Sequence, residues 1–221
     1  MRKQQKGFTL IEVMVATSIM AVMGAMSWLG IDAMLTTKER TFDKSTQTSA
    51  LQIGLSQWAT DLDNAYFSQS IEPMGWDGKA FRLTRRSEQA DKGVVVVAWA
   101  TRTDGQLHQL MRWRSEPVLT QSQWNSAWQQ AAVWARGGQI GSPAVLFPAE
   151  SMNVHFFANN VWTNAQSTAS DKEVEADQES AVLPTSKKKS TQPSGVRLQL
   201  TTPNGTLTKD WVSPLHSGTK S

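Results

Sequence analysis

The longest apolar run in the chain lies near its N-terminus, between Phe8 and Ile31. Its polar exceptions are Thr9, Glu12, Thr17, Ser18 and Ser27. At about 1.5 Å per residue, a helix over this run would extend roughly 36 Å, which exceeds the bilayer core of about 30 Å. The pattern therefore predicts a membrane-spanning helix, which we place at residues 8–35.

Helical character continues beyond this run, because no proline precedes Pro73 and no strong break lies between Asp32 and Tyr66. After a polar stretch, apolar residues recur at spacings of four and three, which predicts a face that packs on a core. We expect Asp61 and Asp63 on the polar side of this helix. One helix from Phe8 to about Ser68 would be roughly 90 Å long, and residues 36–68 would continue it outside the membrane. The apolar residues of the face are Leu51, Leu55, Trp58, Leu62 and Ala65.

Alternating and β-branched runs dominate the rest of the chain, after a turn-rich break at Pro73–Lys79. Asp104-Gly105 and Asn204-Gly205 are strong two-residue hairpin signals between such runs. We therefore expect an α+β fold, in which one long helix packs on an antiparallel β-sheet. The expected strands are Phe81–Thr84, Val94–Thr103, Gln106–Arg114, Met152–Val161, Val196–Thr202 and Thr206–Val212, and Gln123–Ala135 is an expected amphipathic helix.

A polar segment, residues 164–195, separates a β-rich domain at residues 69–163 from a C-terminal hairpin and tail at residues 196–221. Its composition predicts a disordered insertion. Its alternating acids, from Asp171 to Glu179, imitate the ligand spacing of a calcium loop. However, Ala176 stands where such a loop needs glycine and Val182 where it needs glutamate, so we expect no metal there.

Charge and composition give no support for nucleic-acid binding and exclude sites that need cysteine. Three of the 22 basic residues, Arg2, Lys3 and Lys6, precede the apolar run, and the rest of the chain has 19 basic and 19 acidic residues. The net charge of +3 therefore gives no argument for nucleic-acid binding. The absence of cysteine excludes disulfides and thiolate metal sites.

No catalytic constellation is visible in the sequence. His108, His155 and His216 are isolated, without the spacing of paired metal ligands. The chain contains no nucleophile elbow, phosphate-binding loop or dinucleotide fingerprint. Nine of the ten tryptophans follow residue 57, and they fit core or subunit contacts better than a carbohydrate platform. We therefore expect no enzyme and no cofactor.

Glu12 is the unusual residue of the apolar run. A carboxylate at mid-bilayer costs on the order of 2.5 kcal/mol or more, so it is expected to have a partner. A secretory signal peptide would instead end in a small-residue cleavage site and a polar mature start, and neither follows this run.

The stretch Lys6–Ala16, KGFTLIEVMVA, resembles the leader of type IV prepilins and type II secretion pseudopilins. The resemblance implies that a prepilin peptidase removes residues 1–7 by cutting between Gly7 and Phe8 and then methylates the Phe8 amine. It also implies a pilin-like fold. A carboxylate at Glu12 can pair with the Phe8 amine of a neighbouring subunit. The basic N-terminus would stay in the cytoplasm, so the chain would cross the lipid of the bacterial inner membrane once and place its C-terminal domain in the periplasm.

The body of the chain resembles the J-type minor pseudopilin of type II secretion systems. The stretches that carry this resemblance are Ala50–Ala65, Phe81–Arg85, Leu110–Trp113 and Gly195–Leu200. It implies a subunit of the pseudopilus tip, with the I-, K- and H-type minor pseudopilins and the major pseudopilin as partners. The charged insertion after Asn164 departs from that pattern.

Two alternatives stay open at this stage. A minor pilin of a type IV pilus or DNA-uptake system would carry the same leader, although such pilins often have a C-terminal cysteine pair that this chain lacks. A membrane-anchored periplasmic binding module is the second alternative.

Overall fold

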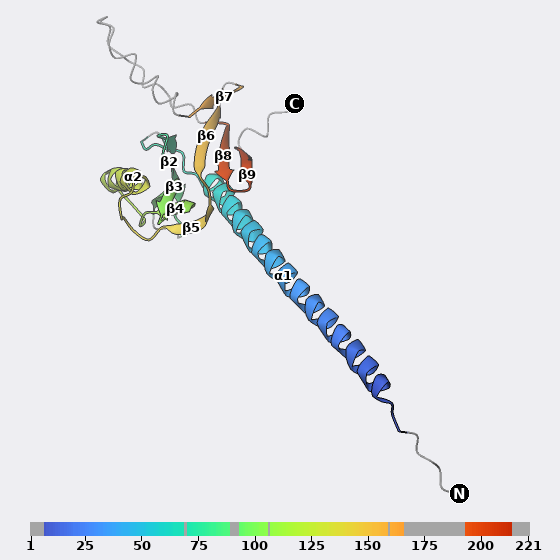
Figure 1. Ribbon diagram of the computed structural model, residues 1–221. Helices are drawn as coiled ribbons and strands as arrows, with labels where there is room; N and C mark the ends of the chain where they lie inside the picture. Colours follow the sequence, from blue (N-terminus) through green and yellow to red (C-terminus); the bar gives the residue numbers. More distant parts are fainter. Residues whose placement is uncertain are drawn as a thin grey trace, which may run out of the picture. The chain divides into compact units, whose positions relative to one another are not determined.

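A computed structural model of the chain describes residues 7–68, 70–88, 93–105, 107–158, 160–165 and 193–213. It has a long N-terminal helix that packs against antiparallel β-sheets, which confirms the predicted α+β class (Figure 1). The elements are α1 (Leu10–Asp63), β1 (Met74–Trp76), β2 (Ala80–Arg86), β3 (Val94–Asp104), β4 (Leu107–Arg114), α2 (Gln121–Ala135), β5 (Ala144–Pro148), β6 (Ser151–Ala158), β7 (Val161–Asn164), β8 (Gly195–Thr202) and β9 (Gly205–Val212).

The chain divides into two units, Met1–Ser49 and Ala50–Ser221, and we call the second unit the head. In the first unit, the described residues of α1 are all exposed. In the head, the predicted apolar face is confirmed: Trp58 and Leu62 are fully buried, and Leu51, Leu55 and Ala65 pack against the same core. The stretch of α1 from Ala50 onward therefore belongs to the head.

Helix α1 ends at Asp63 rather than at Ser68 as predicted, because the chain turns there to join β2. The Ala65 N–H donates to the carbonyl of Leu62, which closes the last turn. Tyr66 and Thr84 then share a backbone hydrogen bond of 2.8 Å, and the Arg86 N–H donates to Asn64. Backbone hydrogen bonds to a strand thus replace those of a further helical turn.

The first sheet has the order β1-β2-β3-β4-β5, all antiparallel, and its two faces are both covered. Phe81, Leu83 and Trp99 lie on the face that packs with Trp58 of α1. The opposite face packs against α2, which begins with a capping box between Thr120 and Gln123. The predicted hairpin is confirmed, although Asp104 pairs with Leu107 and the turn begins at Gly105, and the predicted helix at Gln123–Ala135 is confirmed as well.

Most of the tryptophans lie in the core, as expected. Trp58, Trp99 and Trp134 are at most 2% exposed. Stacked or edge-on ring contacts join several of them, for example Trp124 and Trp128 at 5.1 Å between ring centroids. Because these rings are covered by protein, they are not available as a carbohydrate platform.

The second sheet has the order β7-β6-β8-β9. It contains the predicted hairpin, but its turn is Pro203-Asn204 rather than Asn204-Gly205, because Gly205, with a φ of 124° that side chains rarely allow, already pairs with Thr202. The predicted single strand Met152–Val161 is wrong, because Asn160, with a φ of 66°, reverses the chain and creates the hairpin β6–β7. The acidic and basic runs of the insertion, Asp171 to Lys189, lie outside the described residues.

Asp61 does not lie on a polar side of the helix, and that prediction is wrong. Its carboxylate is fully buried and accepts hydrogen bonds from five nitrogen atoms. Arg112 donates two of them, at 2.7 and 2.8 Å, and Arg85 donates one at 2.7 Å. The Trp99 indole and the Gln57 amide complete the set. We call Asp61, Arg85, Trp99 and Arg112 the Asp61 cluster; it fastens the last turns of α1 to β2, β3 and β4.

Asp63 makes the corresponding contact with the second sheet. Its carboxylate accepts a 2.8 Å hydrogen bond from the indole of Trp211 on β9. The two aspartates at the end of α1 therefore bind one sheet each. Asp63 is exposed, as predicted, so water also solvates its charge, whereas the buried Asp61 depends on its protein donors.

Deletion of residues 1–37 should leave a folded, soluble domain, because every buried residue of α1 follows Ala50. Deletion of residues 1–66 should unfold it, since Trp58, Asp61 and Leu62 are then lost from the core. Circular dichroism and thermal unfolding of the two truncated proteins measure this. Equal thermal midpoints for both would contradict the assignment of α1 to the core.

Candidate functional site

The predicted processing residues lie at the start of the described chain. Gly7, Phe8 and Thr9 precede the first turn of α1 and are not helical. All three are exposed, Phe8 to 89%, and nothing lies within 4 Å of the position that a Cβ of Gly7 would occupy. The Gly7–Phe8 peptide bond therefore lies in exposed backbone outside the helix. The basic residues Arg2, Lys3 and Lys6 lie outside the described residues.

Glu12 occupies the first turn of α1 and forms a capping box with Thr9. Its carboxylate accepts from the Thr9 N–H at 2.9 Å and from the Thr9 hydroxyl at 2.8 Å. In return, the Glu12 N–H lies 3.4 Å from the Thr9 hydroxyl oxygen. The carboxylate thus satisfies one backbone donor that the helix itself leaves free, the Thr9 N–H, and its charge suits the positive end of the helix dipole.

The capping box was overlooked in the sequence, although Thr9-Leu10-Ile11-Glu12 has the Ser/Thr-x-x-Glu form that signals it. It gives Glu12 a partner within its own chain. It also keeps Phe8 and Thr9 outside the helix, so one residue both fixes where α1 begins and leaves the Gly7–Phe8 bond free.

The hydroxyl groups within the apolar run are satisfied by the helix. Thr17 donates to the carbonyls of Val13 and Met14, and Ser18 donates to that of Met14 at 2.8 Å. Hydroxyls bonded in this way cost little in a lipid environment. The helix is long and apolar enough to cross a membrane, so it could anchor the chain there.

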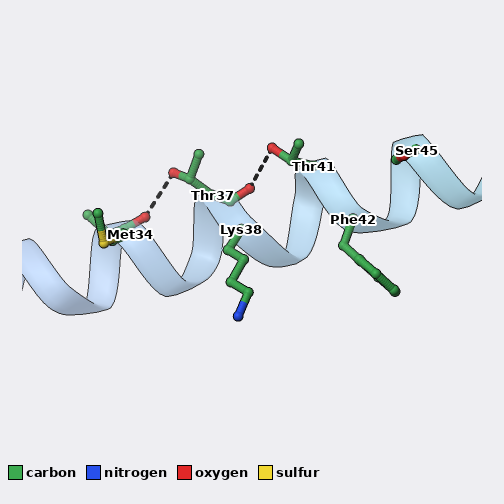
Figure 2. A pocket seen from close by; sticks show the side chains of 7 residues that line it. Met34, Thr37, Lys38, Thr41, Phe42 and Ser45 are labelled. Carbon is green, nitrogen blue, oxygen red and sulfur yellow. Dashed lines mark hydrogen bonds between the residues drawn. The ribbon is translucent and has the colours of Figure 1, made fainter.

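A shallow surface lies farther along α1, on the residues shown in Figure 2. The hydroxyls of Thr37 and Thr41 donate to the carbonyls of Ala33 and Thr37 at 2.8 Å each. These hydroxyls are therefore bonded within the helix, and Phe42, which belongs to the same open surface, is 70% exposed. Such a surface can pack against another helix, whereas it is too open to enclose a small ligand. Its residues are Ala33, Met34, Thr37, Lys38, Thr41, Phe42 and Ser45.

The described part of the chain contains no group of three or more histidines, aspartates or glutamates that could hold a metal ion. His108 contacts the Thr103 hydroxyl across a hairpin, at 3.2 Å. His155 lies in β6, and His216 lies outside the described residues. Among the described residues, the features that stand out are thus the exposed Gly7–Phe8 segment, the capping box and the open surface of α1.

Residues 2–28 match the prokaryotic N-terminal methylation motif. This match covers the Gly7–Phe8 junction, the capping box and most of the apolar run. No curated protein matches the chain. The motif implies a pilin-like or pseudopilin-like protein, processing by a prepilin peptidase and assembly with other pilin-like subunits.

Proposed function

We propose that the chain is a J-type minor pseudopilin, a structural subunit of the type II secretion pseudopilus tip that helps to start pseudopilus assembly. The observation that carries this proposal is the exposed, non-helical Gly7–Phe8 junction directly before a capped apolar helix. Cleavage there removes the basic leader and leaves an amine on Phe8. The partners are the I-, K- and H-type minor pseudopilins and the major pseudopilin.

The exposed length of α1 favours assembly over catalysis. Within the first unit, large apolar side chains such as Leu10, Met23 and Leu35 are more than half exposed. Apolar side chains over such a length need lipid or neighbouring helices around them. Subunits that exchange lipid for one another's helices meet this need, so we assign the helix to the inner membrane before assembly and to a filament afterwards.

The subtype rests on the head. The stretches that resemble the J-type family include Ala50–Ala65 and Phe81–Arg85, which contribute Asp61 and Arg85 to the Asp61 cluster. The resembling stretch Leu110–Trp113 contributes Arg112 to the same cluster. The three stretches are distant in sequence, yet their charged residues meet in one buried cluster. This supports the proposal that the head has the same structure as the heads of J-type pseudopilins. The absence of cysteine favours this reading over a minor pilin of a type IV pilus.

The mature protein should begin at Phe8 and carry one methyl group on its amine. Intact-mass analysis of the protein extracted from membranes measures both, in cells with and without a prepilin peptidase. A Gly7→Val variant should remain uncut, because a β-branched side chain hinders close approach of an enzyme to the backbone. A mature start beyond Phe8, or retention of Met1, would overturn the proposal.

Whether the protein belongs to a type II secretion system or to a type IV pilus is tested separately, by identifying the subunits that purify with the mature protein. Recovery of I- and K-type minor pseudopilins supports the type II secretion assignment. Recovery of type IV pilus subunits instead would replace it with the minor-pilin alternative and leave the processing result intact.

A further inference from the structure

The two sheets of the head end in four edge strands, and three of these are poorly suited to pair with another strand. Strand β1 has three residues and β7 has four. Strand β5 ends in Pro148, and its pairing with β4 shifts register between Leu110 and Met111. Short strands, prolines and irregular register are the usual protection of sheet edges.

Strand β9 lacks these features. All eight of its residues pair with β8 in one unbroken register, from Gly205 with Thr202 to Val212 with Gly195, and it contains no proline. The alternation of an antiparallel pair sets which backbone groups face outward. The Ser213 N–H donates to Ser194, and the Trp211 carbonyl oxygen lies 3.1 Å from the Cβ position of Gly195, so both point toward β8.

The backbone N–H and C=O groups of Thr206, Thr208, Asp210 and Val212 therefore point away from β8. Within the described ranges, no hydrogen bond satisfies these groups. Val212 is 61% exposed, and the other three residues are exposed as well. An eight-residue strand with unpaired backbone groups is a template for a further strand.

The side chains of β9 indicate which kind of polypeptide segment could pair with its free edge. The carboxylate of Asp210 is neutralised by Arg197, with two hydrogen bonds of 2.7 Å that lower the pKa of this carboxyl. Lys209, on the other side of the strand, has no ion-pair partner among residues 7–213 where these are described. It is flanked by Leu207 and Trp211, which pack on the head core.

We propose that the free edge of β9 binds an extended segment of a different pilin-like subunit, which adds a fifth strand to the second sheet. The segment has an acidic residue opposite Lys209 and apolar residues opposite Leu207 and Trp211, since directly opposed side chains on one face contact each other. With a second copy of this chain, no antiparallel pairing puts an acidic side chain opposite Lys209, because Asp210 lies on the other face of the strand and is already paired with Arg197. The proposal rests on the assembly role proposed above, but not on the type of secretion or pilus system.

Photocrosslinking of the full-length protein in the cells that make it tests the proposal. A photoreactive phenylalanine analogue is placed at residue 206, 208 or 210 in turn, and crosslinked peptides are identified by mass spectrometry. We expect one segment of one other subunit, with the crosslinked position moving two residues for each step of the probe. Crosslinks to a second copy, to this chain's own residues or to no protein would overturn the proposal.

Substitutions on β9 separate edge pairing from folding. Thr208→Pro removes an outward N–H and leaves the hydrogen bonds to β8 intact, so the head should stay folded while the crosslink yield falls at least about tenfold. Thr208→Ala is the matched control and should retain the yield. Lys209→Glu should lower the yield and Lys209→Arg should preserve it.

A lysine on an edge strand can also serve only to prevent self-association. In that case Lys209→Thr would produce dimers joined at β9, and the wild-type protein would give no crosslink to another subunit. This outcome would overturn the proposal while normal cleavage at Gly7–Phe8 would leave the proposed function standing.

Discussion

Replacement of Asp61 by asparagine should lower the free energy of unfolding of the head by about 3–5 kcal/mol, the usual cost of breaking a buried ion pair. Arg85 and Arg112 are only 6% and 14% exposed, and both direct guanidinium groups at the Asp61 carboxylate. Asparagine keeps the shape of the side chain but removes its charge. Arg112 then has no other carboxylate partner within the described head, whereas Arg85 retains Glu88 at 3.2 Å.

Chemical denaturation of the full-length protein in detergent measures this loss. Asp43→Asn is the matched control, because Asp43 is an exposed aspartate on the same helix, and it should change stability by no more than about 0.5 kcal/mol. Combining Asp61→Leu with Arg85→Met and Arg112→Met should recover much of the loss, because no buried charge then lacks a partner. An unchanged midpoint for Asp61→Asn would show that the cluster does not stabilise the head.

The position of Asp61 could have been predicted in part from the sequence. Asp61 follows Trp58 by three residues and precedes Leu62, so helical geometry places it beside the apolar face. The polar side was predicted from its chemistry rather than from its angle around the helix. Its partners could not be predicted, because Arg85 and Arg112 lie 24 and 51 residues farther along the chain.

Periodicity predicted the elements that are long or have strong turn residues. The hairpins β3–β4 and β8–β9 are confirmed, but each turn is shifted by one residue from the predicted pair, because Asp104 pairs with Leu107 and Gly205 with Thr202. Strands β1 and β5 were missed, because three to five residues beside prolines give no readable alternation. Such strands exist because the neighbouring strand supplies their hydrogen bonds, and the sequence does not contain that information locally.

In the candidate site, too, some features could be predicted from the sequence and others could not. The Gly7–Phe8 junction was predicted from the leader alone; it lies within residues 2–28, which match the methylation motif, and cleavage there stays a prediction. Glu12 was interpreted through the cost of burying its charge, so its role in capping α1 was overlooked. The free edge of β9 could not be predicted, because it depends on the order of strands in the second sheet.

Glu12 caps α1, and we propose that it also pairs with the Phe8 amine of a neighbouring subunit; one experiment can separate these two roles. Glu12→Gln keeps an oxygen that can accept from Thr9, as glutamine does in other capping boxes, but it removes the charge. Glu12→Leu removes both. Thr9→Val removes the hydroxyl partner and keeps the carboxylate, at a cost of about 1 kcal/mol in helix stability.

We expect Glu12→Gln and Glu12→Leu to insert into the membrane and to be cut at Gly7, since neither changes the junction and a neutral side chain favours insertion. Both should lose recovery of partner subunits by at least about tenfold, because an amine in low dielectric is left without its counter-charge. Glu12→Asp should be intermediate, since its shorter side chain reaches the amine less well, and Thr9→Val should assemble nearly as wild type. Co-purification at matched expression, together with secretion, measures these effects. If Glu12→Gln recovers partners as well as wild type while Glu12→Leu does not, the carboxylate acts by capping the helix and not by pairing with the amine.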